Sequence, residues 1–119
     1  MPRPAIVLTA LLAAGCIAIR RTPDPFHVHL VNQSQEHIRA YAHPPLGRAY
    51  YLIGSVLPGQ SRAIPARCED FLGRSTSIRL RAGLDDTFLS GWGVIQCSDS
   101  LVVFIPTDGV ALASVEVWP

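Results

Sequence analysis

Four histidines fall within a stretch of seventeen residues, and imidazole is the side chain that most often binds transition metals in proteins. They are His27, His29, His37 and His43. His27 and His29 are two residues apart, and residues two apart on a β-strand point to the same face. The spacing therefore allows both imidazoles to reach one zinc or copper ion.

A third metal ligand depends on how the neighbouring strands pair. If residues 26–31 and 38–42 form a hairpin, His37 lies diagonal to His29, with about 7–8 Å between their Cα atoms. This arrangement gives a metal site of His27, His29 and His37. We favour the competing interpretation, in which the three histidines belong to the solvated polar face of an amphipathic sheet. No carboxylate or cysteine is in register with them, and a copper carrier usually offers soft sulfur ligands.

Motifs that carry catalysis do not occur in the chain: there is no G-x-S-x-G, H-E-x-x-H or G-x-G-x-x-G pattern and no P-loop. The adjacent carboxylates of Asp85 and Asp86 supply too few oxygen ligands for calcium. We therefore expect a protein that is not an enzyme and that uses no cofactor.

Aromatic residues are the other candidates for function, since Tyr and Trp are favoured at protein interfaces. We select Tyr41, Tyr51 and Trp92 as candidate binding residues. Tyr51 follows Tyr50, so on a strand one of the two must face away from the core. Trp92 lies between two glycines, which leave open backbone around it. The alternative is that these rings belong to the core or the rim of a small domain.

The elements that must position these residues are short β-strands. Residues 26–31 and 38–42 alternate between apolar and polar side chains, which is typical of strands with one buried face. Similar runs recur with a turn signal about every ten residues, such as Pro58-Gly59, and there is no helical period. We expect seven or eight short strands in an antiparallel two-sheet β-sandwich, Ig-like or transthyretin-like, with a small barrel as the alternative.

Two later segments carry more specific expectations. A turn is predicted over 83–86, followed by a strand over 88–97 that is bulged or bent at its two internal glycines. Residues 101–105 are apolar throughout, so they are predicted to form the centre of a sheet with both faces covered.

Close to residue 1, an apolar run too short to span a bilayer ends in small residues and a cysteine, Ala13-Ala14-Gly15-Cys16. This segment resembles the lipobox of bacterial lipoproteins, in which the cysteine thiol receives a diacylglyceryl group and the chain is cut just before it. The resemblance implies a signal peptide over 1–15, a lipidated Cys16 with a tether over 16–25, and a single sandwich domain over 26–119. An ordinary cleaved secretory signal and a cytosolic strand or helix are the alternatives.

The same resemblance implies a location and a kind of partner. Lipidation at Cys16 would anchor the chain in a membrane of a bacterial cell envelope, with the domain facing the periplasm or the exterior. The residue after it, Ile17, is not the aspartate that marks inner-membrane retention in enteric lipoproteins, so the outer membrane is favoured. Short lipoproteins with one sandwich domain usually have a structural or protein-binding role, and we expect an envelope protein as partner.

If Cys16 carries lipid, Cys68 and Cys97 remain as a pair. An oxidising envelope compartment would favour a disulfide between them, and two buried free thiols are the alternative.

The charge balance excludes nucleic acid as a partner. Ten arginines and nine acidic residues are scattered along the chain, so there is no electrostatic footprint for DNA or RNA.

Overall fold

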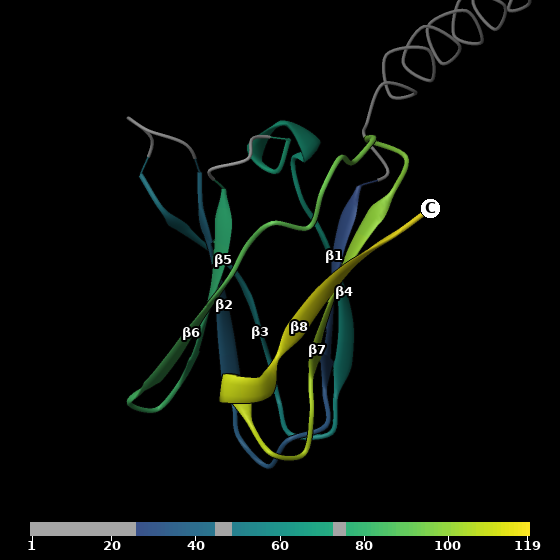
Figure 1. Ribbon diagram of the computed structural model, residues 1–119. Helices are drawn as coiled ribbons and strands as arrows, with labels where there is room; N and C mark the ends of the chain where they lie inside the picture. The colour runs from purple at the N-terminus through teal and green to yellow at the C-terminus, as the bar shows by residue number, and fades with distance from the viewer. Residues whose placement is uncertain (1–25, 45–48, 73–75) are drawn as a thin grey trace, which may run out of the picture.

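The computed structural model describes residues 26–44, 49–72 and 76–119. Within these ranges the chain forms eight β-strands in two four-stranded sheets, which face each other as the layers of a β-sandwich (Figure 1). In chain order the elements are β1 (His27–Asn32), β2 (Ile38–His43), β3 (Tyr51–Val56), β4 (Ser61–Pro65), the 3-10 helix η1 (Cys68–Asp70), β5 (Ser77–Ala82), β6 (Asp85–Leu89), β7 (Ser100–Ile105), the 3-10 helix η2 (Val110–Leu112) and β8 (Ser114–Trp118). The predicted all-β sandwich is confirmed.

The predicted signal peptide (1–15) and tether (16–25) lie outside the described residues. Among the residues that the structure does describe, no helix combines the length and the apolar character needed to cross a membrane.

The strand pairing differs from the prediction at one place. Sheet A has the order β4-β1-β7-β8, and sheet B has the order β3-β2-β5-β6. Within these sheets of the described chain, neighbouring strands are antiparallel except β1 and β7, which run parallel from His27 beside Ser100 to Asn32 beside Ile105. The expectation of a purely antiparallel sandwich is therefore wrong for this pair. Parallel neighbours need a crossover connection, and here the intervening chain supplies β4 and all of sheet B.

β1 and β2 do not form the predicted hairpin, because they belong to different sheets. The buried side chain of Asn32 directs the crossing between the sheets. Its amide nitrogen donates hydrogen bonds to the carbonyl oxygens of Glu36 (2.7 Å) and Leu57 (3.1 Å). Its Oδ1 accepts hydrogen bonds from the backbone N–H (3.0 Å) and the hydroxyl (2.6 Å) of Ser34. The bonds to Ser34 and Glu36 satisfy the turn without a ladder back onto β1, and the bond to Leu57 ties the turn to the end of β3 in sheet B.

The hydrophobic core lies between the sheets and follows the predicted alternation. In β1, for example, Val28 and Leu30 are buried, whereas His27 and His29 are only half-buried. The buried cluster consists of Phe26, Val28, Leu30, Ile38, Ala40, Ala42, Val56, Cys68, Phe71, Ile78, Leu80, Ala82, Ile95, Leu101, Val103, Ile105 and Val110.

The β3 and β4 edges approach each other closely at one side of the sandwich. Gly54 of β3 lies opposite Ile64 of β4, and a Cβ atom placed at Gly54 would collide with the Cδ1 atom of Ile64. The absence of a side chain at Gly54 therefore lets Ile64 pack against the core along this side.

The segment after β5 differs from the prediction. The turn occupies Gly83 and Leu84 alone, and β6 already begins at Asp85. The predicted strand over 88–97 is wrong, because β6 ends at Leu89 and residues 90–97 form no strand. Gly91 and Gly93 have φ values of +72° and +92°, which an extended strand does not adopt.

β7 is a central strand, as predicted, but only its inner face is fully covered. On its outer face Val102 is buried by its neighbours, whereas Phe104 is 36% exposed. The prediction of two covered faces is therefore wrong, since no third layer lies over sheet A within the described ranges.

Candidate functional site

The structure separates the three histidines of the predicted metal site. His27 and His29 point outward from β1 in sheet A, with their ring centroids 6.1 Å apart. His37 precedes β2 and lies with sheet B, because the hairpin that would have brought it to His29 does not form. Among the described residues, no group of three or more His, Cys, Asp or Glu side chains is arranged to hold a metal ion. His37 therefore does not share a site with His27 and His29.

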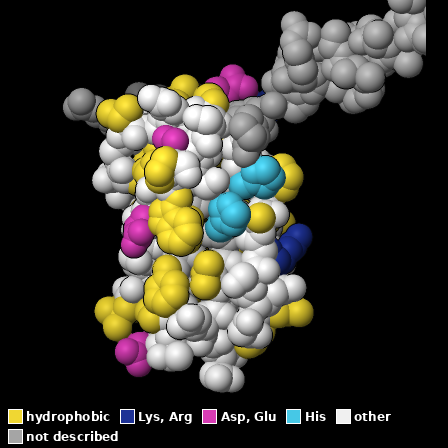
Figure 2. Space-filling view, turned by 90° about the vertical axis from the view of Figure 1, so that its right-hand side faces the viewer, with side chains coloured by type: hydrophobic (Ala, Val, Ile, Leu, Met, Phe, Trp, Pro, Cys, Tyr) yellow, Lys and Arg dark blue, Asp and Glu magenta, His cyan; other side chains and the backbone are white. Residues whose placement is uncertain are grey.

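The outer face of sheet A is apolar around the two histidines. Figure 2 looks onto this face and shows two histidine side chains beside a group of hydrophobic side chains. The strand register places Val102 of β7 next to His29 and Glu116 of β8 on the far side of Val102. The indole Nε1 of Trp118 donates a 3.0 Å hydrogen bond to the Glu116 carboxylate.

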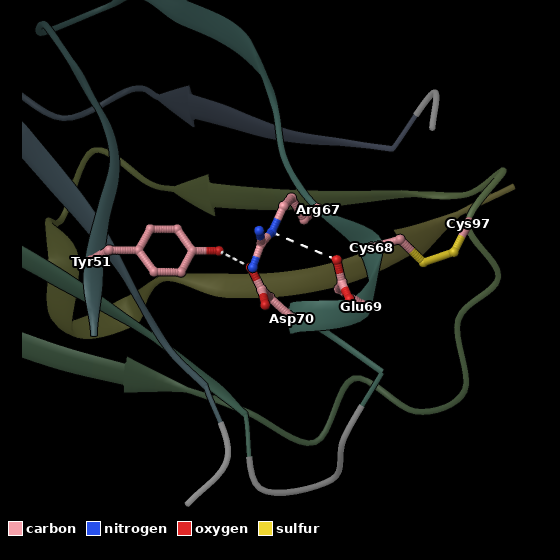
Figure 3. Close-up of polar contacts among 6 residues, drawn as sticks. All are labelled: Tyr51, Arg67, Cys68, Glu69, Asp70 and Cys97. Carbon is pink, nitrogen blue, oxygen red and sulfur yellow. Dashed lines mark hydrogen bonds and ion pairs between the residues drawn. A yellow bond between two sulfur atoms is a disulfide. The ribbon is translucent and has the colours of Figure 1, made fainter. Parts of the chain in front are cut away.

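The cysteines expected to pair do so. Cys68 of η1 and Cys97 form a disulfide, with their Cα atoms 5.3 Å apart and a sequence separation of 29. The bond joins the short η1 segment to the strand-free segment before β7 (Figure 3). The predicted lipidation site, Cys16, lies outside the described residues.

Tyr51, one of the predicted binding aromatics, bonds to a buried carboxylate. Its hydroxyl donates a 2.5 Å hydrogen bond to Oδ2 of Asp70, whose side chain is 1% exposed. The Arg67 guanidinium lies 3.5 Å from the same oxygen, and this contact raises the pKa of Arg67. Figure 3 shows Tyr51 pointing toward Asp70, with the Arg67 guanidinium beside the same carboxylate. The three residues line a shallow groove of about 320 Å³ between the edges of the two sheets.

The other two predicted aromatics lie in different surroundings. Trp92 is partly buried against the core, where its Nε1 donates a 3.3 Å hydrogen bond to the carbonyl oxygen of Phe71. Tyr41 is half-buried on the outer face of sheet B. The structure therefore does not bring Tyr41, Tyr51 and Trp92 together on one surface.

Tyr41 instead belongs to a contiguous surface that we call the aromatic–arginine face. It consists of Tyr41, His43, Tyr50, Arg79 and Phe88. Tyr50 stacks on His43 with ring centroids 4.9 Å apart and packs edge-on against Tyr41 at 6.0 Å. His43 meets Phe88 edge-on at 5.4 Å, so the rings form a continuous row across β2 and β6. Tyr50 and Phe88 are each more than half exposed.

Arg79 lies at the centre of the face and is held on two sides. Its guanidinium lies 5.5 Å from the centroid of the Phe88 ring, a cation–π geometry. It also donates paired hydrogen bonds of 3.2 and 2.6 Å to the two carboxylate oxygens of Asp86. The paired bonds raise the pKa of Arg79 and, aided by the charge of Arg81, lower that of Asp86. A guanidinium fixed in this way presents a planar group in one orientation.

Four members of this face were not selected from the sequence: His43, Tyr50, Arg79 and Phe88. The β5–β6 hairpin contains a signal that could have found two of them. Gly83 marks a turn, and a hairpin about it pairs Arg79 with Phe88 and Arg81 with Asp86. The pairing of β2 with β5, which brings Tyr41 beside Arg79, joins segments far apart in sequence and has no local signal.

No protein-family model matches the sequence, and no curated protein matches it either. Among solved structures, the chain is similar to a protein from Eubacterium rectale determined by NMR, with a TM-score of 0.48 and 8% sequence identity. The match covers 80% of this chain and 87% of that protein.

Proposed function

We propose that this protein is a non-catalytic, lipid-anchored module of a bacterial cell envelope that binds a partner protein through the aromatic–arginine face. The observation that carries the binding role is the exposed row of packed rings around Arg79. Tyr, Phe and Arg are the residue types enriched at the centres of protein interfaces, where they contribute most of the binding energy.

The prearranged geometry of the face supports the same role. Because Arg79 is already fixed by Asp86 and Phe88, little side-chain entropy remains to be lost when a partner binds. The sandwich holds four of the five side chains on β2, β5 and β6, whose backbones are fixed by ladder hydrogen bonds, and Tyr50 directly precedes β3. A rigid aromatic surface of this kind suits recognition more than chemistry.

The envelope location is supported by two features. The lipobox-like segment ends at Cys16, ten residues before the first described residue, Phe26. An extended chain of that length reaches about 30–35 Å, so the sandwich would lie close to the membrane. The Cys68–Cys97 disulfide is compatible with an oxidising compartment.

Site-specific photocrosslinking in the host tests the binding role. A photoreactive amino acid is placed at Tyr50, which is 57% exposed, and in a matched control at Leu112, which is 62% exposed outside the face. We expect a discrete crosslinked protein from position 50 alone, lost when Phe88→Ala is added. Equal crosslinking from both positions, or none from position 50, would contradict the proposal.

A further inference from the structure

A second feature of sheet B adjoins the aromatic–arginine face. A hollow of about 230 Å³, which we call the basic hollow, is lined by His37, Arg39, Arg81 and Gly83. The residues come from the start of β2, the end of β5 and the β5–β6 turn, which lie at the same end of the sheet (Figure 1). Three of the four lining residues are basic, two of them from the start of β2 and one from β5.

The strand register explains the concentration of positive charge. Arg39 of β2 and Arg81 of β5 are direct cross-strand partners, so their side chains leave the same face of the sheet. Like charges directly opposite each other on neighbouring strands destabilise a sheet. The fold therefore holds these two guanidiniums together at a cost in stability, which an anion between them would offset.

The neighbouring carboxylate does not neutralise the pair. Asp86 accepts both of its hydrogen bonds from Arg79, and its contact with Arg81 is an ion pair to Nε at 3.1 Å. Within the described ranges, no hydrogen bond or ion pair engages Arg39. Asp86 thus contacts the guanidiniums of Arg79 and Arg81, and Arg39 is left without a carboxylate partner among the described residues.

We propose that the basic hollow binds the carboxylate of an acidic side chain in an extended segment of the partner protein. This inference deepens the proposed function and rests on it, because it takes the occupant from the partner of the aromatic–arginine face. Guanidinium groups bind carboxylates through paired, charge-assisted hydrogen bonds, and Arg39 and Arg81 offer two such groups across one strand spacing.

The spacing of residues along sheet B also predicts which residue types the bound segment of the partner contains. Moving two residues along the strands leads from the Arg39–Arg81 row to the Tyr41–Arg79 row, a step of about 7 Å. In an extended peptide, residues two apart are separated by the same step and point to the same side. If one residue places its carboxylate in the basic hollow, the residue two positions away therefore lies against the rings of the aromatic–arginine face. The preferred segment alternates acidic with aromatic residues on the side that faces the sheet.

A nucleic acid is a poorer match for the same surface. Binding along a phosphate backbone depends on several neutralised phosphates, whereas the outer face of sheet B here carries Arg39, Arg79 and Arg81 against Asp86, a surplus of only two positive charges. The combination of a small basic hollow with a row of rings fits a short mixed segment better.

A titration with two synthetic peptides tests the inference. The disulfide-bonded protein, with backbone and arginine Nε–H resonances assigned, receives a capped pentapeptide of alternating glutamate and tyrosine at physiological ionic strength. The control peptide has glutamine in place of glutamate. We expect saturable shifts of the Arg39 and Arg81 Nε–H signals with the glutamate peptide alone. Shifts of equal size with both peptides, or none at these signals, would overturn the inference.

Matched charge variants separate a specific site from general attraction. Arg39→Gln should weaken binding of the glutamate peptide about tenfold, the loss of one charge-assisted hydrogen-bonding group. Arg62→Gln removes the same charge from the exposed edge strand β4 and should leave the affinity unchanged. Equal weakening by both variants would show non-specific attraction and reject the site. Arg39 is exposed, so the amide spectrum of Arg39→Gln should match that of the parent.

The peptide and crosslinking experiments fail independently. If position 50 crosslinks a partner but the peptide does not bind, the protein-binding role stands and the basic hollow is rejected as its acidic subsite. If the peptide binds at Arg39 and position 50 crosslinks nothing, the hollow binds carboxylates and the proposed partner surface is rejected.

Discussion

The Tyr51 hydroxyl donates a 2.5 Å hydrogen bond to the buried carboxylate of Asp70, and this bond joins the edge of sheet B to the η1 segment. Asp70 is 1% exposed, and Arg67 places a positive charge 3.5 Å from the same oxygen. A buried carboxylate needs such donors, because burial without them costs free energy. Tyr51 is therefore a stabilising residue of the edge groove as much as an exposed aromatic.

Tyr51→Phe should lower the free energy of unfolding by about 1.5 kcal/mol, because Asp70 loses a donor while the ring is retained. Urea unfolding followed by tryptophan fluorescence measures the change. The control is Tyr50→Phe, which alters the adjacent tyrosine and for which no hydroxyl hydrogen bond is present among the described contacts. Equal midpoints for Tyr51→Phe and the parent would show that the hydrogen bond contributes nothing to stability.

The Cys68–Cys97 disulfide should be the largest single contribution to stability that one covalent change can remove. It closes a loop of 29 residues, and the chain-entropy model gives about 3–4 kcal/mol for a loop of that length. The double substitution Cys68→Ser/Cys97→Ser should lower the free energy of unfolding by this amount, measured in urea. Cys16→Ser is the control and should leave the midpoint unchanged. A loss below about 1 kcal/mol would contradict the model.

Gly54 and Ile64 should show strong coupling in a double-mutant cycle. Gly54→Ala places a methyl group against Ile64 Cδ1 and should destabilise the protein by about 1 kcal/mol through overpacking. Ile64→Val removes Cδ1, so Gly54→Ala should cost much less in that background. Additive effects of the two substitutions would show that the cost of Gly54→Ala does not come from contact with Ile64 Cδ1.

The alternation of side chains was the reliable signal in the sequence. It identified β1, β2 and β5 and the face that each buries, because one buried face leaves a period of two in the residue types. The alternation could not identify which strands pair with one another. β1 pairs with β7, far away in sequence, and the choice depends on contacts between strands that no local pattern records.

The wrong predictions at the candidate site also arise from strand pairings that the sequence does not reveal. The hairpin that would have assembled the histidines failed at Asn32, whose side chain satisfies its own turn and sends the chain to the other sheet. Tyr41 was selected from its type, but its neighbours Arg79 and Phe88 follow only from the pairing of β2, β5 and β6. Asp86, assigned to a turn, is the residue that fixes Arg79.

Asp86 should make the stability of the protein depend on acid pH. The Arg79 hydrogen bonds lower the pKa of Asp86 below its ordinary value of 3.8, so the ionised form stabilises the folded state. This contribution is fully present above pH 3.8 and is lost as the pH falls through the lower, folded-state value. Asp86→Asn should therefore melt below the parent at pH 6, and the gap should close toward pH 2.

The control for this titration is Asp108→Asn, which changes an exposed carboxylate in a turn. Asp108 forms no ion pair with a described residue, so its substitution should shift the melting temperature by a small and constant amount. A gap between Asp86→Asn and the parent that stays constant from pH 6 to pH 2 would show that the Arg79 contact adds no stability.

The proposed lipid anchor can be tested by the mass of the protein recovered from its host under non-reducing conditions. If the segment ending at Cys16 acts as a lipobox, the mass corresponds to a chain that begins at Cys16 and carries acyl groups. It should also be two hydrogens below that of the reduced chain, since Cys68 and Cys97 are joined. In the matched variant Cys16→Ala the acyl mass should be absent, while the disulfide remains. An unprocessed, reduced chain that starts at Met1 would remove both the anchor and the envelope from the proposed function, and would leave the aromatic–arginine face to be tested as the surface of a protein in a reducing compartment.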